Sequence, residues 1–253
     1  MNHNTDQEED VGDQHAWLSV GAKDKADSIE ILSAGLGVKS VLEIGSGTGA
    51  ILQELDRRGF ATDYYCIEPS AAEYSFMIKR VEISRLRDSE CAELSKSRLG
   101  GRRYDLVVLS HVLEHLMTPA VLLAGAIDLG RYVIVEVPLE GTLAGNLRAR
   151  IKARFTAIPR LNNAAGHVQF LSPASARLLA SFCGGRVTAT RVYCPTYGER
   201  RDSYSAITSG IRHLLGTAIF ARLYYGHMAM LVERRPTVPE HDRTRWPRLY
   251  HTD

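Results

Sequence analysis

Three glycines at alternate positions, Gly45, Gly47 and Gly49, are the first residues whose spacing indicates chemistry. Glycine permits a sharp turn and lets backbone N–H groups come close to a ligand. The apolar run before the turn predicts a strand buried on both faces, and the apolar stripe after it predicts a helix whose N-terminus faces that ligand. Residues 38–55 therefore predict a binding site for a nucleotide-type ligand.

Glu68 is the second residue whose type and place indicate ligand binding. It follows the predicted strand 63–67, and a carboxylate at that strand end can accept hydrogen bonds from both hydroxyls of a ribose. Gly45, Gly47 and Ala50 also satisfy the G-x-G-x-x-G/A dinucleotide pattern, which places such an acid about 20 residues further on. These residues alone therefore leave a nicotinamide-dependent oxidoreductase open.

Three histidines, His111, His115 and His167, are candidates for taking a proton from a substrate, because imidazole titrates near neutral pH. His111 directly follows the predicted strand 104–110, whereas His115 could instead brace the turn and His167 could make a loop contact. With Glu114, they would also supply imidazoles and a carboxylate to a divalent ion. We take a site without metal as the main hypothesis and a metal-assisted site as the alternative.

These residues require a fold that brings several strand ends together. Apolar strands alternate with helices along the chain, which predicts an α/β fold with a doubly wound, mostly parallel sheet. Right-handed crossovers then place every ligand-facing turn at the carboxyl ends of the strands. Strands are predicted near residues 41–44, 63–67, 84–87, 104–110, 131–138, 186–194 and 227–233, and helices at 17–34, 71–81, from 119 and at 174–182.

The string E-I-G-S-G-T-G, residues 43–49, resembles the first motif of class I S-adenosylmethionine-dependent methyltransferases. The resemblance implies a seven-stranded Rossmann-like sheet with an antiparallel last strand, and S-adenosylmethionine as the cofactor. It implies that Glu43 and the glycine turn hold the amino acid end of the cofactor, that Glu68 holds the ribose and that the end of strand 104–110 flanks the sulfonium. The implied cofactor-binding residues are Glu43, Gly45, Ser46, Gly47, Gly49, Glu68, Glu90 and Ser110.

Other parts of the chain carry the resemblance with different strength, over about residues 17–233. Family spacing puts the third strand near 84–87 and Glu90 beside the adenine, and in the family the leader helix with Trp17 and Lys23 closes over the cofactor. The stretch H-V-Q-F-L-S, residues 167–172, resembles small-molecule enzymes such as the ubiquinone-biosynthesis O-methyltransferases. The block from His111 to His115 is similar to the metal-binding E-x-x-E-H set of small-RNA 3′-end enzymes, with His111 in place of the first acid.

The composition is that of an ordinary globular chain, with 253 residues, 45% apolar and 24% charged. A net charge of +2 is too small to indicate nucleic acid or membrane binding over the whole surface. No membrane span or signal peptide is expected, because the N-terminus is polar and acidic and no long apolar run occurs. The four cysteines form no C-x-x-C pair, which indicates reduced thiols and a cytoplasmic protein without a zinc-finger site.

We expect one methyltransferase domain over residues 15–234, a disordered segment 1–14 and a loose tail 235–253 that could pack on a second subunit in a homodimer. Helical lid insertions are expected near 139–172 and 195–226. Residues 143–155 of the first insertion carry four cations at alternate positions, which favour an acidic or phosphorylated acceptor. They are Arg148, Arg150, Lys152 and Arg154.

The sequence therefore predicts an S-adenosylmethionine-dependent methyltransferase that acts on a hydroxyl, or less readily an amine, of a small molecule. The alternatives are a metal-assisted methyltransferase of a nucleic-acid or sugar hydroxyl, a nicotinamide-dependent oxidoreductase, and a non-catalytic relative that only binds cofactor.

Overall fold

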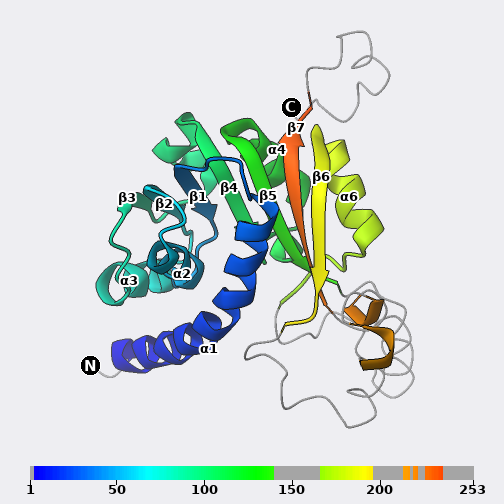
Figure 1. Cartoon of the computed structure of the whole chain (residues 1–253). Coiled ribbons are helices and arrows are strands. Elements are labelled where there is room, and N and C mark those ends of the chain that lie inside the picture. Colours follow the sequence, from blue (N-terminus) through cyan, green and yellow to red (C-terminus); the bar gives the residue numbers. More distant parts are fainter. Residues whose placement is uncertain (1–2, 140–165, 196–212, 217–218, 222–225, 236–253) are drawn as a thin grey trace.

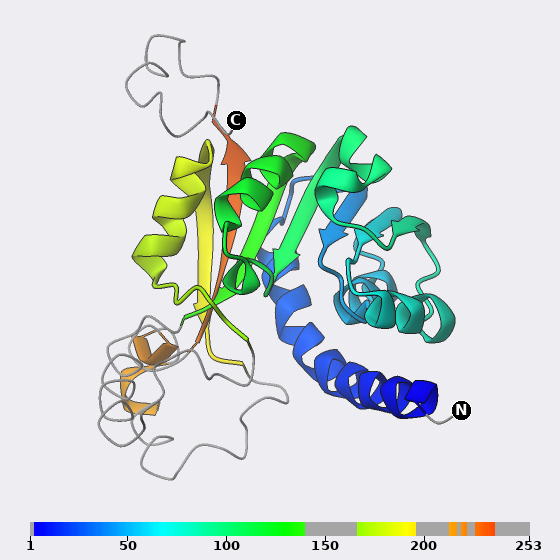
Figure 2. The ribbon, with the colours of Figure 1, turned by 180° about the vertical axis from the view of Figure 1, so that it is seen from behind.

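A single seven-stranded sheet forms the centre of the molecule, and helices cover both of its faces (Figures 1 and 2). The computed structural model describes residues 3–139, 166–195, 213–216, 219–221 and 226–235. The strand order is β3-β2-β1-β4-β5-β7-β6, and only the two pairs that involve β7 are antiparallel. The predicted doubly wound α/β fold is therefore confirmed.

The strands are short in the first half of the sheet and longer in the second. Those at the centre are buried along almost their whole length, as expected of strands covered on both faces. Their bounds are β1 (Ser40–Ile44), β2 (Asp63–Ile67), β3 (Leu86–Glu90), β4 (Tyr104–Ser110), β5 (Gly130–Pro138), β6 (Gly185–Tyr193) and β7 (His227–Arg234).

The helices divide the core into one apolar cluster on each face of the sheet. Apolar side chains of α1, α2 and α3 pack on one face, and those of α4 and α6 pack on the other. Pro119 begins α4, as expected, and the Ser172 capping box begins α6. The bounds are α1 (His3–Leu32), α2 (Ala50–Arg58), α3 (Ala71–Arg80), α4 (Pro119–Leu129) and α6 (Pro173–Phe182), with short 3₁₀ turns at η1 (Leu94–Lys96), η2 (Arg98–Gly101) and η3 (Leu113–His115).

The third strand lies two to three residues later than its predicted place at 84–87. Asp56 at the end of α2 accepts hydrogen bonds from the Ser84 backbone N–H (2.7 Å) and hydroxyl (2.6 Å), and Arg85 also binds it. This contact holds residues 84 and 85 against α2, so the strand begins at Leu86.

The structure also differs from the predicted disorder of residues 1–14, because α1 begins at His3. Its first half is joined to the rest of the protein by side chains: Gln14 donates to Glu73 (2.9 Å), and the His15 ring is 2.9 Å from the hydroxyl of Thr48. Most residues of the predicted lid segments and of the tail lie outside the described residues, so both remain predictions.

Asp105, in β4, fixes the register between β4 and the neighbouring strand β1. Its Oδ2 accepts hydrogen bonds from the backbone N–H groups of Lys39 and Ser40 (3.0 Å each) and from the Ser40 hydroxyl (3.1 Å). Burial acts to raise the pKa of Asp105, but these hydrogen bonds outweigh it and lower the pKa. The carboxylate therefore stabilises the fold at neutral pH, and that stabilisation is lost as pH falls through the lowered pKa.

We predict that Asp105→Ala lowers the free energy of unfolding at pH 7 by about 2–3 kcal/mol, because three donors lose a charged acceptor. Urea titration measures this change, and the difference from the native chain should shrink below pH 4. Asp128→Ala is the control, since Asp128 is exposed and forms only a surface pair with Arg234 at 3.2 Å; it should cost less than about 0.5 kcal/mol. Equal losses from the two variants would contradict this role for Asp105.

Candidate active site

The glycine turn after β1 is pressed between two neighbouring elements. Gly45 donates its N–H to the carbonyl of Ile67 at 2.8 Å, and Gly45, Gly47 and Gly49 all have positive φ (75°, 54° and 78°). A Cβ atom on Gly45 would lie 2.6 Å from Cγ2 of Val112, just after β4. The turn therefore has no room for a side chain at this position, and the residues after β4 are in direct contact with it.

The N-terminus of α2 opens onto this turn. Gly49 is the N-cap residue and supplies no side chain to the first N–H groups of the helix. A Cβ atom on Gly47 would meet nothing nearer than Oε2 of Glu73, at 3.9 Å. Backbone N–H groups and open space at a helix N-terminus suit an anionic or otherwise polar ligand group.

Both carboxylate oxygens of Glu68 are held by backbone N–H groups, one from the glycine turn and one from the start of α3. Oε2 accepts the N–H of Gly47 at 2.6 Å, and Oε1 accepts the N–H of Ser70 at 2.7 Å. Burial raises the pKa of this carboxyl, and the two N–H bonds partly oppose the rise. Because each carboxylate oxygen has about two acceptor positions, Glu68 can still accept from a ligand hydroxyl.

Glu43 places a second acid under the turn, with only 1% of its surface exposed. Burial raises its pKa to about 8, with Lys25 acting against the rise and Glu68 and Glu136 adding to it. Within the described residues, Oε2 of Glu43 and Oγ of Ser110 are buried polar atoms with no hydrogen-bond partner. Such atoms favour a ligand that brings donors or positive charge.

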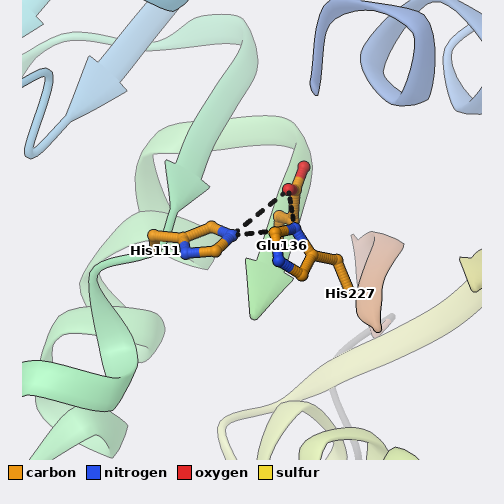
Figure 3. A group of neighbouring side chains, drawn as sticks. All are labelled: His111, Glu136 and His227. Atoms are coloured by element: carbon orange, nitrogen blue, oxygen red, sulfur yellow. Dashed lines mark hydrogen bonds and ion pairs between the residues drawn. The ribbon is translucent and has the colours of Figure 1, made fainter. Parts of the chain in front are cut away.

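A second group of polar side chains lies at the ends of β4 and β5 and at the start of β7 (Figure 3). Nε2 of His111 is 3.2 Å from Nδ1 of His227, and the two nitrogens are 3.4 and 3.5 Å from Oε1 of Glu136. Tyr193 donates its hydroxyl to the same oxygen at 2.7 Å. We call His111, Glu136 and His227 the strand-end cluster.

Electrostatics set the charge of this cluster. Burial is the main cause that lowers the pKa of His111 to about 3; the nearby Lys25 and His227 act in the same direction, and Glu136 opposes them. Burial acts to raise the pKa of Glu136, but its contacts with the imidazoles of His111 and His227 hold it well below its usual range. The cluster therefore presents a neutral imidazole and a buried carboxylate at neutral pH.

The three histidines named from the sequence fall into two groups. His111 belongs to the strand-end cluster, whereas the rings of His115 and His167 contact each other at 4.8 Å and lie with Glu114 in a separate group. The predicted four-residue metal set is therefore wrong as one ligand group. Among the described residues, Glu114 links the two groups, through Oε1 at 3.4 Å from Nδ1 of His111.

Two predicted contacts have other surroundings. The carboxylate of Glu90 is bound by Ser97 and Arg98, which supply two side-chain contacts and a backbone N–H at 3.0 Å. Trp17, expected near the cofactor, is 49% exposed. The lysine of α1 whose charge acts on Glu43 is Lys25, two residues after the expected Lys23.

Sequence reasoning missed Glu136, His227, Tyr193 and Lys25. An acid within the apolar strand 131–138 was a detectable signal, because such a residue is rarely buried without a partner. His227 carried no local signal: it is the first residue of an antiparallel strand, which brings it to the edge where the parallel strands end.

Comparison with known proteins gives the family. The family described as a methyltransferase domain matches residues 20–184, more than half of the chain. The chain belongs to this family. It is an S-adenosylmethionine-dependent methyltransferase, and the nicotinamide-dependent reading of the glycine turn is wrong. A search of the curated proteins finds no match to this methyltransferase.

Solved structures share the fold of the methyltransferase at low sequence identity. A Haloferax volcanii complex of the Trm112 methyltransferase activator and its partner matches with TM-score 0.58 and 14% identity, over 90% of this chain and 99% of that chain. Mycolic acid cyclopropane synthase CmaA1 with SAH and CTAB matches with TM-score 0.57 and 16% identity, over 81% of this chain and 82% of that chain. The plantazolicin methyltransferase BamL with a desmethyl analogue and SAH matches with TM-score 0.53 and 16% identity, over 90% of this chain and 91% of that chain.

The site of the methyltransferase suits this cofactor chemically. S-adenosylmethionine carries an ammonium and a sulfonium, and the buried oxygen of Glu43 needs a donor or a positive charge. The carboxylate of S-adenosylmethionine suits the N-terminus of α2, which has no side-chain cap, and its ribose suits Glu68. No described helix of the methyltransferase is both long and apolar enough to cross a membrane.

We predict that Gly45→Ala destabilises the methyltransferase by about 2–5 kcal/mol. Positive φ costs a residue with Cβ about 1–2 kcal/mol, and the contact with Val112 adds about 1–3 kcal/mol of overpacking. Gly35→Ala is the matched control, because Gly35 has φ of 78° but no atom within 4 Å of an added Cβ. Urea unfolding measures both; if they lose equal stability, the turn is not tightly packed against Val112.

Proposed function

We propose that the methyltransferase transfers the methyl group of S-adenosylmethionine to a hydroxyl of a small molecule, and less readily to an amine. The observation that carries the proposal is the position of the strand-end cluster next to the glycine turn. His111 belongs to the cluster, and the next residue, Val112, contacts Gly45 of the turn. Groups that can take a proton thus adjoin the turn proposed to hold the cofactor.

The cofactor-binding part of the proposal uses the two strand ends and the turn between them. The N–H groups at the N-terminus of α2, beside the glycine turn, hold the cofactor carboxylate, Glu43 faces the ammonium and Glu68 accepts from the ribose. Ser110 contributes its buried hydroxyl near the sulfonium, and Glu90 lies beside the adenine. The full proposed set is Glu43, Gly45, Ser46, Gly47, Gly49, Glu68, Glu90 and Ser110.

Methyl transfer needs alignment of the acceptor with the carbon–sulfur bond, and positioning of this kind can be worth an effective molarity on the order of 10⁵ M or more. A hydroxyl acceptor must also lose its proton. His111 is neutral at physiological pH and stands beside the ionised Glu136, so this cluster is the proposed acceptor of that proton. His115 and His167 remain the second candidates, as a separate group on the other side of Glu114.

The acceptor and the setting of the enzyme are proposed from the sequence. The cations of residues 148–154 lie outside the described residues, and they favour an acidic or phosphorylated acceptor under a lid. The tail 235–253, also outside them, is the proposed contact of a homodimer. Cys66, Cys91 and Cys183 are free thiols, which supports a reducing compartment, for which we propose the cytoplasm.

A panel of acceptors tests the proposed reaction. Release of S-adenosylhomocysteine is measured with phenols, hydroxy acids, sugar phosphates and amines, and NMR of the product shows whether the new methyl is on oxygen or nitrogen. We expect turnover with an acidic hydroxyl compound. On that acceptor, His111→Ala should lower kcat about 10²–10⁴-fold with cofactor affinity kept. Turnover only with amines, or loss of kcat in His167→Ala alone, would overturn the assignment.

Proton release on cofactor binding tests Glu43. With its pKa raised to about 8, Glu43 is protonated at pH 7 and must ionise to face an ammonium. We predict that binding of S-adenosylmethionine at pH 7 releases about one proton more in the native chain than in Glu43→Gln, and that this difference vanishes above pH 9. Calorimetry in buffers of different ionisation enthalpy measures it. Equal proton release from both proteins would remove Glu43 from the site.

We predict that Glu68→Ala weakens cofactor binding by at least about tenfold, because ribose hydroxyls lose a charged acceptor. Circular dichroism should show an intact fold, and calorimetry gives the Kd. Glu93→Ala is the control, since Glu93 is an exposed acid paired only with Lys96 at 3.4 Å, and its Kd should not change. An unchanged Kd in Glu68→Ala would count decisively against the ribose role.

A further inference from the structure

We propose that the strand-end cluster binds a divalent first-row metal ion of the zinc type, held by His111, Glu136 and His227 (Figure 3). The binding part of this inference depends only on the arrangement of these three side chains. Its catalytic part rests on the proposed function, because the ion would meet the hydroxyl of the acceptor.

Three candidate ligand atoms converge on one point. The distances between Nε2 of His111, Nδ1 of His227 and Oε1 of Glu136 are 3.2, 3.4 and 3.5 Å. Four ligands placed tetrahedrally at about 2.1 Å from a zinc ion are about 3.4 Å from one another. The three atoms therefore match one face of such a tetrahedron, and the fourth corner is left for water or substrate.

The ligand types agree with the geometry. Two imidazoles and one carboxylate suit zinc and related ions, and three protein ligands with one open position are typical of catalytic zinc sites. A site of this composition is not the predicted set of His111, Glu114, His115 and His167, because Glu136 and His227 come from β5 and β7.

Partners behind the ligands orient them as partners of metal ligands do. Nδ1 of His111 lies 3.4 Å from Oε1 of Glu114, so a proton on Nδ1 leaves the lone pair of Nε2 facing the cluster. Tyr193 donates its hydroxyl to Oε1 of Glu136 at 2.7 Å. Carboxylates and hydroxyls in these positions fix ring orientation and raise the affinity of a metal site.

The backbone also aims His111 at the cluster. His111 is the one described non-glycine residue with positive φ, at 57°, and its N–H is bound to the carbonyl of Glu136 at 3.0 Å. A residue with a Cβ rarely adopts this conformation, and it persists only where the surroundings hold it. This conformation, with the backbone bond to β5, brings the ring beside Glu136 and His227.

The local charges favour a cation. Glu136 and Glu114 are both almost fully buried next to His111, and Lys25 is the described cation that acts on this cluster. A divalent ion bound here would compensate the negative charge that these two buried carboxyl groups carry when ionised.

A bound ion would activate the acceptor by accepting its hydroxyl oxygen at the open corner. The O–H proton would move to Oε2 of Glu136, a buried oxygen without a hydrogen-bond partner among the described residues. The oxygen lone pair would then form the bond to the methyl carbon, while the carbon–sulfur electron pair stays on sulfur as the neutral thioether. The metal ion is neither oxidised nor reduced in this step.

Cobalt titration of the metal-depleted full chain tests the site, because Co²⁺ replaces Zn²⁺ and its four-coordinate form absorbs visible light. We expect one saturable set of visible bands in the native chain, displaced by added Zn²⁺. His227→Ala and Glu136→Gln should abolish the bands or weaken Co²⁺ binding more than tenfold, as loss of a ligand does. Each variant is first shown to fold by the rise in melting temperature with S-adenosylhomocysteine.

His167→Ala is the matched control, because His167 belongs to the other histidine group and should leave the cobalt bands unchanged. Absence of the bands from the native chain, or their loss in His167→Ala with retention in His227→Ala, would overturn the site. The methylation assay after chelation separates the two proposals. Hydroxyl methylation without any metal would support the proposed function and refute the catalytic role of the metal. Cobalt binding without hydroxyl turnover would support the metal site and refute the proposed function.

Discussion

Burial of several acids at one edge of the sheet is the constraint on which the rest of this structure depends. Glu43, Glu68, Glu114 and Glu136 are each at most 4% exposed. A buried carboxylate without compensation costs several kcal/mol, so each needs donors or positive charge close by. Backbone N–H groups serve Glu68, Tyr193 and histidines serve Glu136, and the charge of Lys25 reaches Glu43 and Glu136.

Helix α1 is part of this compensation and more than a cover for the sheet. Lys25 brings its charge to two of the buried acids, and Arg191 of β6 donates to Ser28 at 2.6 Å and to the carbonyl of Asp24 at 3.0 Å. His15, nearer the start of the helix, contacts Thr48 of the glycine turn. The same helix thus touches the cofactor turn and the far edge of the sheet, which couples the position of α1 to the electrostatics of the site.

Sequence reasoning succeeded where the signal was local. The glycine turn, Glu68 and the strands 63–67 and 104–110 are fixed by residues adjacent in sequence, and the structure has both strands within the predicted bounds. It misplaced β3, an edge strand without a fully buried residue, because its residues Arg87, Asp88 and Ser89 carry no apolar pattern. It also missed the cluster partners, because Glu136 and His227 meet only through the register that pairs Pro138 with His227.

The antiparallel direction of β7 has a consequence for how such enzymes can diversify. Every parallel strand delivers its last residue to the working edge, but β7 delivers its first, His227. Pairing of β7 along its whole length with β5 and β6 fixes that residue, and the hydrogen bond from the Leu139 N–H to the Gly226 carbonyl at 2.7 Å fixes the residue before it. Changes of length or sequence within residues 196–212 would therefore leave the imidazole of His227 in register with β5, which gives such enzymes a place to admit new substrates.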